Sequence, residues 1–313
     1  MRAITVSSYG ASPSVTELPT PQAGPGQVLI AIQAAGMNPM DVQIANGAWQ
    51  DRVPATFPMV LGADLAGTVR EDGPGASRFA PGDEVFGQLL IPPLGSTGTY
   101  AQYVAVGEDA PLARIPAGLD PVTAAALPTV GVTAMQIAES LAPLDGKIVL
   151  IVGAAGGVGS FLTQLAAQAG AHVDAVAPPA EAARMTGYGA AETIDRAVMP
   201  LPDAVARTHP DGIDALVDVA SDAAQFAALA GHVRPGGTAV TTRYVADLDT
   251  LGRAGVTGVN YQLSMAVPLL DRLAARVAAG SVVPPPITRV NLDDVPSLLG
   301  NPSHTEGKTV ITM

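Results

Sequence analysis

The chain has 313 residues, of which 48% are hydrophobic and 14% are charged. This length exceeds what one hydrophobic core usually holds, so we expect two domains, and the composition excludes a disordered chain. The formal net charge of −12 argues against a nucleic-acid partner, because phosphate binding needs basic patches, and the absence of cysteine excludes disulfides, thiolate metal sites and cysteine nucleophiles.

The first residues predict a strand rather than a targeting segment. MRAITVSSYG lacks the basic and apolar regions of a signal peptide, and Ile4 and Val6 alternate with small polar residues. No apolar run in the sequence reaches the roughly 18 residues that a membrane span needs. We therefore expect a cytoplasmic protein without a membrane partner.

Short strands and turns are expected over residues 1–120. Residues 27–35 alternate loosely after a PQAGPG turn, and 65–69 and 100–106 predict further strands. Residues 39–45 can form a short helix with Asn38 as its N-cap. This pattern of short strands separated by turns is typical of a β-rich domain.

From Pro121 onward the pattern changes to alternating helices and strands. An alanine-rich helical segment is expected over 121–141. Strands are then expected at 148–152, 171–177, 213–219 and 238–242, helices at 182–188 and 268–279, and a last strand at 309–313. This alternation predicts an α/β architecture with a doubly wound parallel sheet.

A glycine-rich turn follows the strand expected at 148–152. Gly153, Gly156 and Gly159 recur at three-residue spacing, with Gly157 added, before apolar residues at helical spacing. Missing β-carbons let the backbone approach a pyrophosphate, and a helix N-terminus then offers free N–H groups and a positive dipole end. The order strand, glycine turn, helix therefore predicts a dinucleotide site gripped by the main-chain amides of 156–159. The alternative is an ordinary turn in a chain rich in glycine and alanine.

Sequence stretches distributed over nearly the whole chain carry a family resemblance. They are AAGMNPMD (34–41), LGADLAGTV (61–69), PGDEVFG (81–87), GTYAQYVAV (98–106), AAALPTVGVTA (124–134), the glycine turn, RPGG (234–237) and EGKTVIT (306–312). In order and spacing they resemble the medium-chain dehydrogenase/reductase superfamily, and within it the zinc-free quinone oxidoreductase (zeta-crystallin-like) branch.

The resemblance implies the domain organisation. A GroES-like catalytic domain would cover 1–120, a Rossmann NADPH-binding domain 121–263, and a return to the catalytic domain 264–313. It also implies an active-site cleft between the domains and a homodimer formed through an edge strand around 256–263.

Departures from the zinc-dependent relatives argue against a catalytic metal. Asn38 stands where those enzymes carry a ligand cysteine, and Ala63 stands where they carry a ligand histidine. Tetrahedral zinc needs clustered cysteine and histidine ligands. The histidines of this chain lie in four separate segments, so we expect surface or capping roles rather than metal binding for His172, His209, His232 and His304.

The nicotinamide cofactor is expected to be NADPH. An NAD-specific fold ends its second strand with an acid that binds the ribose hydroxyls, but here that place reads Ala177-Pro178-Pro179. The zinc-free branch supplies Ser, Lys and Tyr in this region, where this chain has Pro178, Glu181 and Arg196. Arg196 or Arg184 would then bind the 2′-phosphate through its planar guanidinium. The alternative is that both arginines are merely solvated.

By resemblance, the reaction is hydride transfer to a quinone or to the β-carbon of an α,β-unsaturated carbonyl. Asn38 would lie near the nicotinamide ribose and the substrate oxygen, besides capping its helix, and Thr129 would lie by the carboxamide unless it only packs a turn. The other expected cofactor contacts are Gly153, Gly156, Gly157, Val158, Gly159, Ala220, Thr242 and Asn260.

The proton donor is left open by the sequence. Many family members carry Tyr or Lys two residues after the aspartate of this motif, where Asp41 is here followed by Val42 and Gln43. Asp41, Gln43 and Tyr244 are the candidate catalytic residues, with water as the alternative donor. Trp49 and Tyr261 are candidates to line the substrate pocket, each with a packing role as its alternative.

The positions of the two lysines exclude one competing class of enzyme. A short-chain dehydrogenase needs a Tyr-x-x-x-Lys pair, and neither Lys147 nor Lys308 follows a tyrosine by four residues. A different class stays open, namely a dinucleotide-binding sensor or structural protein with little turnover.

Overall fold

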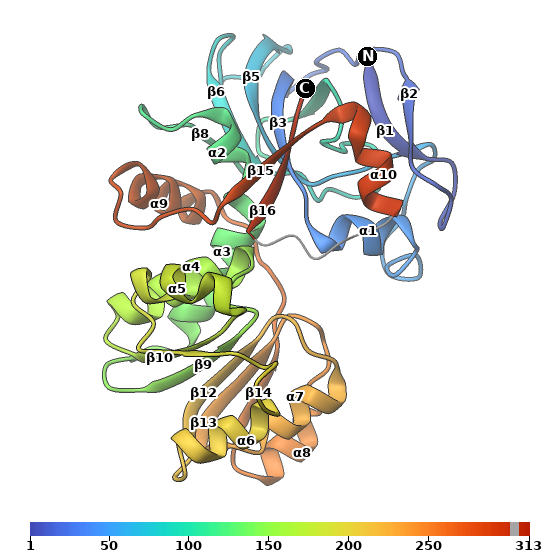
Figure 1. Cartoon of the computed structure of the whole chain (residues 1–313). Helices are drawn as coiled ribbons and strands as arrows, with labels where there is room; N and C mark the ends of the chain where they lie inside the picture. Colours follow the sequence, from blue (N-terminus) through green and yellow to red (C-terminus); the bar gives the residue numbers. More distant parts are fainter. Residues whose placement is uncertain (301–306) are drawn as a thin grey trace. The chain divides into compact units, whose positions relative to one another are not determined.

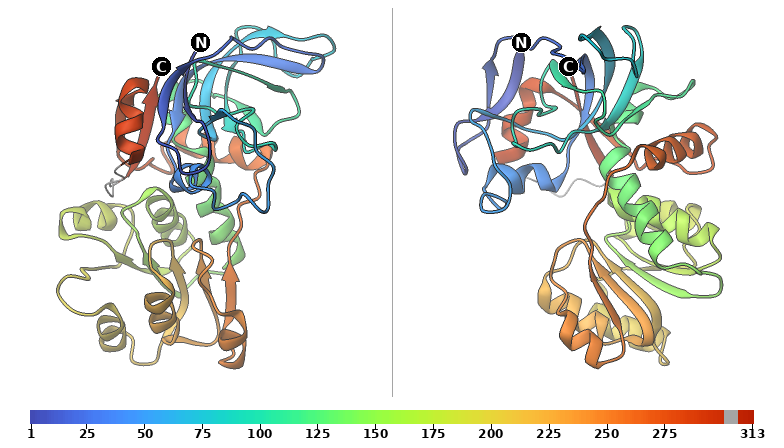
Figure 2. Two further views of the ribbon diagram at one scale, coloured as in Figure 1. Left: turned by 90° about the vertical axis from the view of Figure 1, so that its right-hand side faces the viewer. Right: turned by 180° about the vertical axis from the view of Figure 1, so that it is seen from behind.

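The structure is a computed structural model that describes residues 1–300 and 307–313. The described residues form two units, one built from Met1–Val132 with Met265–Met313 and the other from Thr133–Ser264. The segments carrying the N- and C-termini belong to the same unit (Figure 1, Figure 2).

The first unit consists mainly of antiparallel strands. They are β1 (Arg2–Val6), β2 (Ser14–Glu17), β3 (Gln27–Gly36), β4 (Met59–Val60), β5 (Asp64–Asp72), β6 (Glu84–Gln88), β7 (Tyr103–Gly107), β8 (Leu112–Arg114), β15 (Ile287–Asn291) and β16 (Lys308–Thr312). One sheet runs in the order β15-β16-β3-β5-β6-β8 with β7 paired to β3, and a second runs β2-β1-β4. The pairing of β16 with β3 makes the C-terminal segment part of this unit.

Helices in the first unit are short, apart from α9. They are α1 (Pro39–Ala45), α2 (Pro121–Ala125), α9 (Val267–Ala278) and α10 (Val295–Gly300), with the single turn η2 (Leu292–Asp294). Helix α1 packs Ile44 into a buried cluster with Met59, Tyr100 and Ile311. This cluster holds α1 in place, and the candidate residues Asn38 and Asp41 lie at the start of that helix.

The boundary between the units differs from the one expected at residue 121. Helix α2 contacts β3, β5 and β6, and residues 124–127 are fully buried. A Cβ on Gly36 of β3 would overlap the carbonyl oxygen of Ala125, so the helix lies directly against the strand. The alanine-rich segment therefore belongs to the first unit up to Val132, and the boundary falls inside α3 (Pro128–Ser140).

The second unit is a parallel sheet. Its strand order is β11-β10-β9-β12-β13-β14, every adjacent pair is parallel, and the strands are β9 (Ile148–Val152), β10 (His172–Val176), β11 (Glu192–Ile194), β12 (Ile213–Asp218), β13 (Val233–Thr241) and β14 (Thr257–Asn260). Numbered from β9, this is the 3-2-1-4-5-6 order of the Rossmann fold. The predicted doubly wound sheet is confirmed.

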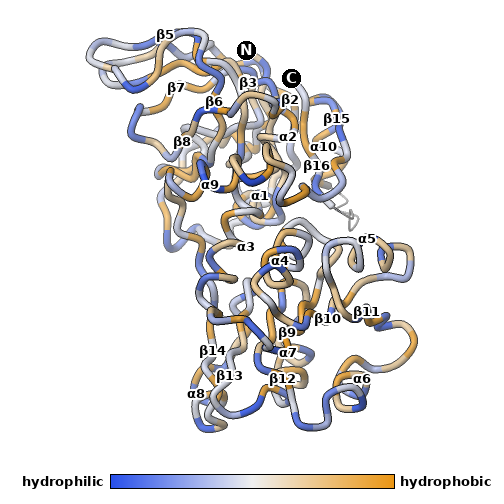
Figure 3. Tube along the Cα trace, turned by 90° about the vertical axis from the view of Figure 1, so that its left-hand side faces the viewer, coloured by the Kyte–Doolittle hydropathy of each residue, from blue (hydrophilic) through white to orange (hydrophobic). Residues whose placement is uncertain are grey.

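Helices cover both faces of this sheet. Figure 1 shows α4 (Gly157–Gln168) and α5 (Ala182–Gly187), preceded by the turn η1 (Pro179–Glu181), on one face, and on the other α6 (Leu201–Thr208), α7 (Ala223–Ala230) and α8 (Leu248–Arg253). Val205, Phe226 and Leu251 from α6, α7 and α8 pack with strand residues in one buried cluster. The central strand β9 is hydrophobic along its length (Figure 3), as its position between two covered faces requires.

Helix length bears on membrane insertion. Within residues 1–300 and 307–313, every helix lacks the combination of length and apolar character that crossing a bilayer demands.

Candidate active site

The glycine turn connects β9 to α4. Gly153 has φ of 84°, and Gly156 is the N-cap of α4. A Cβ on Gly159 would overlap the carbonyl oxygen of Gly153 and lie 2.5 Å from Ala154 Cα, so only glycine lets the helix approach the strand this closely. A Cβ on Gly156 would meet only Gly153 O, at 3.4 Å, so that side of the turn is open. The first-turn N–H groups of Gly157, Val158 and Gly159 need acceptors from outside the helix, and a pyrophosphate fits this arrangement.

The carboxyl ends of the central strands meet beside this turn. A Cβ on Gly153 would lie 3.2 Å from Ala220 Cβ, although the two residues follow β9 and β12 respectively. The Ala220 N–H donates to Asp218 Oδ1 at 3.0 Å, and the Thr242 N–H donates to Asp218 O at 3.4 Å. Ala220 and Thr242 therefore lie on the edge of the sheet where the fold binds its ligands.

Arg184 reaches the glycine turn from α5. Its guanidinium donates to Ser160 Oγ at 2.9 Å and to Ala155 O at 3.0 Å, and it forms an ion pair with Glu181. Arg196 is exposed in the segment after β11. Of the two arginines expected to bind a 2′-phosphate, Arg184 is the one brought against the turn.

Asn260 holds the loop that carries Tyr244. The Asn260 side chain accepts from Ala246 N at 3.0 Å and donates to Ala246 O at 3.1 Å. Tyr244 is 56% exposed and has φ of 58°, in the left-handed region that non-glycine residues rarely adopt. The Tyr261 hydroxyl instead donates to Gln136 Oε1 at 2.5 Å, and burial raises the pKa of Tyr261 to about 12.

A buried network of polar groups in the first unit surrounds Asn38. The Asn38 amide donates to Asp64 Oδ2 at 3.0 Å, while its carbonyl oxygen accepts from Lys308 Nζ at 2.5 Å. Lys308 Nζ also lies 3.4 Å from Asp64 Oδ2. Burial lowers the pKa of Lys308, and the carboxylates of Asp64 and Asp41 partly oppose that effect.

Thr129 completes the hydrogen bonding of Asp64. Its hydroxyl donates to Asp64 Oδ1 at 2.6 Å, and its N–H, at the start of α3, donates to Oδ2 at 3.2 Å. The Gln88 amide donates to the Thr129 hydroxyl at 2.6 Å. Asn38 and Thr129, both predicted from the sequence as cofactor contacts, are thus held by the same carboxylate.

Sequence reasoning did not single out Asp64, Lys308, Gln88 or Tyr100. A usable signal was present for Lys308, because a lysine at the head of the apolar run KTVIT faces burial in a strand and then needs a partner. Asp64 carried a weaker signal, an acid at the start of the apolar segment DLAGTV.

Asp41 is a buried acid with an altered proton affinity. Its Oδ2 accepts from the Tyr100 hydroxyl at 2.5 Å and from the Asn38 N–H at 2.8 Å. Burial nevertheless raises the pKa of Asp41 to about 7, against the lowering effect of those two hydrogen bonds. Burial and the Asp41 carboxyl together raise the pKa of Tyr100 well above its usual value. Asp41 can therefore hold or release a proton near neutral pH.

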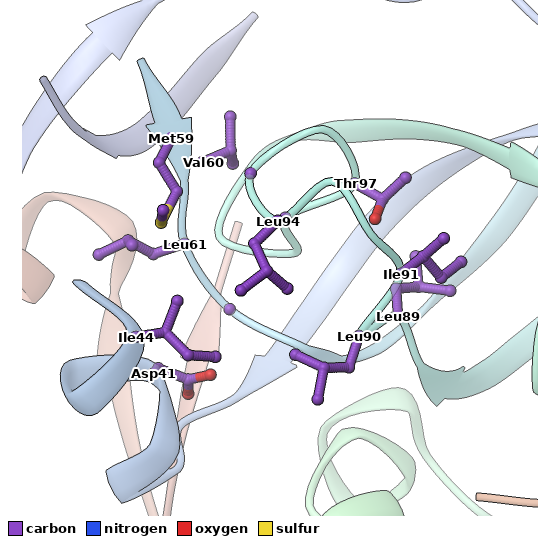
Figure 4. Close-up of a pocket in the computed structure, with 13 residues that line it drawn as sticks. Asp41, Ile44, Met59, Val60, Leu61, Leu89, Leu90, Ile91, Leu94 and Thr97 are labelled. Carbon is purple, nitrogen blue, oxygen red and sulfur yellow. The ribbon is translucent and has the colours of Figure 1, made fainter. Parts of the chain in front are cut away.

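A small pocket lies beside Asp41 (Figure 4). Among the described residues that line it, Asp41 has the one ionisable side chain, and the others include Ile44, Met59, Leu61, Leu89, Leu90 and Leu94. Its volume of about 20 Å³ has room for a water molecule.

Gln43 is exposed on α1, and Trp49 is half-buried and packs against the cluster that contains Ile44.

The histidines are not as dispersed as the sequence suggested. His172 and His209 both approach Asp174, with their Nε2 atoms 3.2 and 2.5 Å from its carboxylate oxygens. His232 is half-buried, and His304 lies outside the described residues. Separation along the sequence was therefore an incorrect argument for His172 and His209, because strand β10 and the end of α6 bring them together.

The comparisons with known proteins agree with the fold and the glycine turn described above. Residues 24–117 match the family described as the alcohol dehydrogenase GroES-like domain. The chain is 30% identical over 331 residues to NAD(P)H oxidoreductase RTN4IP1, mitochondrial, of Mus musculus, which covers 92% of this chain and 82% of that protein. It is 33% identical over 221 residues to the chloroplastic quinone-oxidoreductase homolog of Spinacia oleracea, covering 68% of this chain and 65% of that protein.

A solved structure is similar to this chain over its full length. The quinone oxidoreductase from Coxiella burnetii superposes with a TM-score of 0.88 at 25% identity, covering 100% of this chain and 99% of that one. The chain therefore belongs to the medium-chain dehydrogenase/reductase superfamily, in its quinone oxidoreductase branch.

Proposed function

We propose that this protein is an NADPH-dependent, zinc-independent oxidoreductase that transfers hydride to a quinone or to the β-carbon of an α,β-unsaturated carbonyl. The observation that carries the proposal is the contact between Lys308 Nζ and Asn38 Oδ1, at 2.5 Å. Asn38 stands where the zinc-dependent relatives place a metal ligand, so here an ammonium group supplies the positive charge that zinc supplies there.

The cofactor is bound by the second unit. The open face of Gly156 and the first-turn N–H groups of α4 would hold the pyrophosphate, and Arg184, rather than the exposed Arg196, would bind the 2′-phosphate of NADPH. The three residues directly after β10, Ala177-Pro178-Pro179, carry no acid to repel that phosphate, and the next acid, Glu181, is paired with Arg184. NADPH, when bound, supplies the hydride.

The first unit polarises the acceptor. The Asn38 amide and the Lys308 ammonium stabilise the negative charge that develops on the substrate oxygen as hydride reaches the β-carbon. Asp64 and Thr129 keep both groups oriented through the hydrogen bonds described above. Trp49 is proposed to line the apolar part of the substrate site in this unit.

Asp41 returns the proton. With its pKa raised to about 7, the carboxylic acid is partly protonated at neutral pH. The neighbouring pocket has room for one water molecule, which passes the proton from Asp41 to the α-carbon of the enolate or to the second quinone oxygen. Gln43 and Tyr244, both exposed, are the less favoured candidates for this step.

The test is a titration of the protein with NADPH and NADH, followed by NADPH consumption with a panel of small quinones and enones. We expect tighter binding of NADPH, turnover that survives treatment with a chelator, and loss of the preference for NADPH in Arg184→Ala. A preference unchanged in both Arg184→Ala and Arg196→Ala would remove the proposed phosphate site. Tight binding without turnover would support the alternative of a dinucleotide sensor or structural protein, and activity restored only by zinc would refute zinc independence.

A further inference from the structure

A cluster of two histidines and an aspartate forms where the end of α6 meets β10, on the face of the sheet that α6 covers. His172, Asp174 and Val176 alternate along β10, so their side chains share that face. Val205 of α6 packs in the same buried cluster as Val176 and Leu150, which fixes α6 against this face. His209 directly follows the last residue of α6 and is thereby delivered to Asp174.

The Asp174 carboxylate is buried and incompletely satisfied. Its Oδ2 lies 2.5 Å from His209 Nε2. Its Oδ1 has no hydrogen-bond partner among the described residues, and His172 Nε2 lies 3.2 Å away but outside hydrogen-bonding geometry. A buried carboxylate with an unpaired oxygen is costly, so a group that fills this place is favoured.

Neighbouring charges do not supply the missing cation. Lys147 and Arg234 are both paired with Asp214. Glu192 of β11 stands beside Asp174 in the strand register, which adds negative charge next to the cluster. With neutral imidazoles, this part of the unit carries a net negative charge and attracts a cation.

We propose that His172, Asp174 and His209 form a binding site for one divalent transition-metal ion of the zinc class. Two imidazole nitrogens and a carboxylate oxygen are a ligand set that zinc accepts, with water in the fourth position. The three ligand atoms lie within 4.8 Å of one another. Ligands of one zinc ion at about 2.1 Å stand roughly 3.4 Å apart, so His209 Nε2 must move away from Asp174 Oδ2, which it approaches to 2.5 Å, and His172 must adjust its position. The His172 side chain is 44% exposed and free to make that movement.

The role of the ion follows from its place in the sheet. His172 begins β10, whereas the glycine turn follows the carboxyl end of β9, so the ion lies toward the opposite edge of the sheet from the dinucleotide. It would tie the end of α6 to β10 and stabilise the second unit. It would not take part in hydride transfer, and it is independent of the positions of Asn38 and Ala63 in the first unit.

The experiment uses the full chain prepared without a histidine tag and stripped with a chelator. Zn²⁺ binding is measured by calorimetry, and Co²⁺ serves as a spectroscopic probe of tetrahedral coordination. We compare wild type with His172→Gln, which changes a half-exposed side chain and leaves the core intact. His232→Gln is the matched control, because it makes the same replacement at a histidine of the same unit that lies outside the cluster.

We expect one ion per wild-type chain, a Zn²⁺-dependent rise of several degrees in the unfolding temperature, and an affinity at least about a hundredfold weaker in His172→Gln but unchanged in His232→Gln. NADPH turnover should be the same in all three proteins, which separates this site from the proposed activity. Equal Zn²⁺ affinity in wild type and His172→Gln would overturn the proposal, as would binding without a tetrahedral Co²⁺ spectrum.

Discussion

At the scale of single residues, the buried ion pair of Lys308 and Asp64 has the largest consequence. The two side chains are 3% and 0% exposed, so each charge depends on the other and on Asn38 for compensation. Removing one partner of a buried pair leaves an uncompensated charge, whereas removing both can be nearly neutral. The pair therefore contributes little net stability but makes each member hard to replace alone.

Lys308→Met should be destabilising by about 3–5 kcal/mol, because Asp64 would keep its charge in a buried place. Urea unfolding gives the free energy of unfolding for the variant and for Lys147→Met. Lys147 is 45% exposed and pairs with Asp214, so its replacement should cost about 0–1 kcal/mol. The double variant Lys308→Met/Asp64→Asn should regain part of the loss. Similar free energies of unfolding for Lys308→Met and Lys147→Met would show that the buried pair of Lys308 and Asp64 is not needed for stability.

Asp41 should make stability depend on pH. Its pKa rises from 3.8 to about 7 on folding, so the folded chain binds more protons than the unfolded chain between those values. The contribution of Asp41 is therefore complete below about pH 4 and is lost as the pH rises toward 7, by up to about 4 kcal/mol.

Asp41→Asn keeps the shape and the acceptor oxygen but cannot titrate. The wild-type free energy of unfolding, minus that of Asp41→Asn, should fall as the pH rises from 4 to 7. Urea unfolding at a series of pH values measures it. Parallel curves for the two proteins would contradict the raised pKa. By the proposed mechanism, wild-type turnover should also decline above pH 7, as the acid loses its proton.

At the scale of elements, the helices and strands that could be predicted were those with a local sequence pattern. The strand predicted at 148–152 and the helix predicted at 39–45 are confirmed, because a short apolar run and an Asn-Pro helix start are local features. β11 was not predicted, since a three-residue strand has too little pattern to detect. The boundary was expected at Pro121, whereas the first unit extends to Val132, because the periodicity of the alanine-rich segment predicts a helix but not the sheet on which its first part packs.

The glycine turn offers a test of close packing between β9 and α4. In Gly159→Ala the new methyl group would overlap Gly153 O, so the start of α4 must move away from β9. We expect a loss of stability of about 1–3 kcal/mol, and at least tenfold weaker NADPH binding as the N–H groups shift. Gly187→Ala in α5 is the control, since its Cβ would meet nothing within 4 Å. Gly187→Ala should leave NADPH binding unchanged, and its free energy of unfolding should be equal to or slightly above that of wild type. Unchanged binding in Gly159→Ala would argue against a pyrophosphate at this turn.

At the scale of the whole molecule, the features missed from the sequence are the long-range ones. Lys308 and Asn38 are 270 residues apart, and His209 and Asp174 are 35 apart. No local period relates such positions, because only the sheet order brings them together. The family resemblance predicted the fold class correctly, yet it did not point to Lys308 or Asp64.

Strand β14 gives a prediction about assembly. It ends the parallel sheet, so one row of its backbone N–H and C=O groups is unpaired within that sheet. We expect a homodimer through this edge, with twice the chain mass of 31.5 kDa in light scattering. Val259→Arg places a charge on the half-buried edge and should shift the mass toward the monomer, while Val198→Arg, on a residue that is 76% exposed, should not. A monomeric mass for wild type at all concentrations would exclude the dimer.

The late arrival of β16 matters while the chain is being translated. Residues 34–36 of β3 pair with β16, and Asn38 waits for Lys308, which is synthesised 270 residues later. At about 5–20 residues per second, this part of the first unit stays incomplete on the ribosome for roughly 15–55 seconds. The second unit is continuous in sequence and can finish folding in that interval. Nascent chains should therefore acquire protease resistance first in residues 133–264, and a chaperone would find its binding site on the open edge of β3.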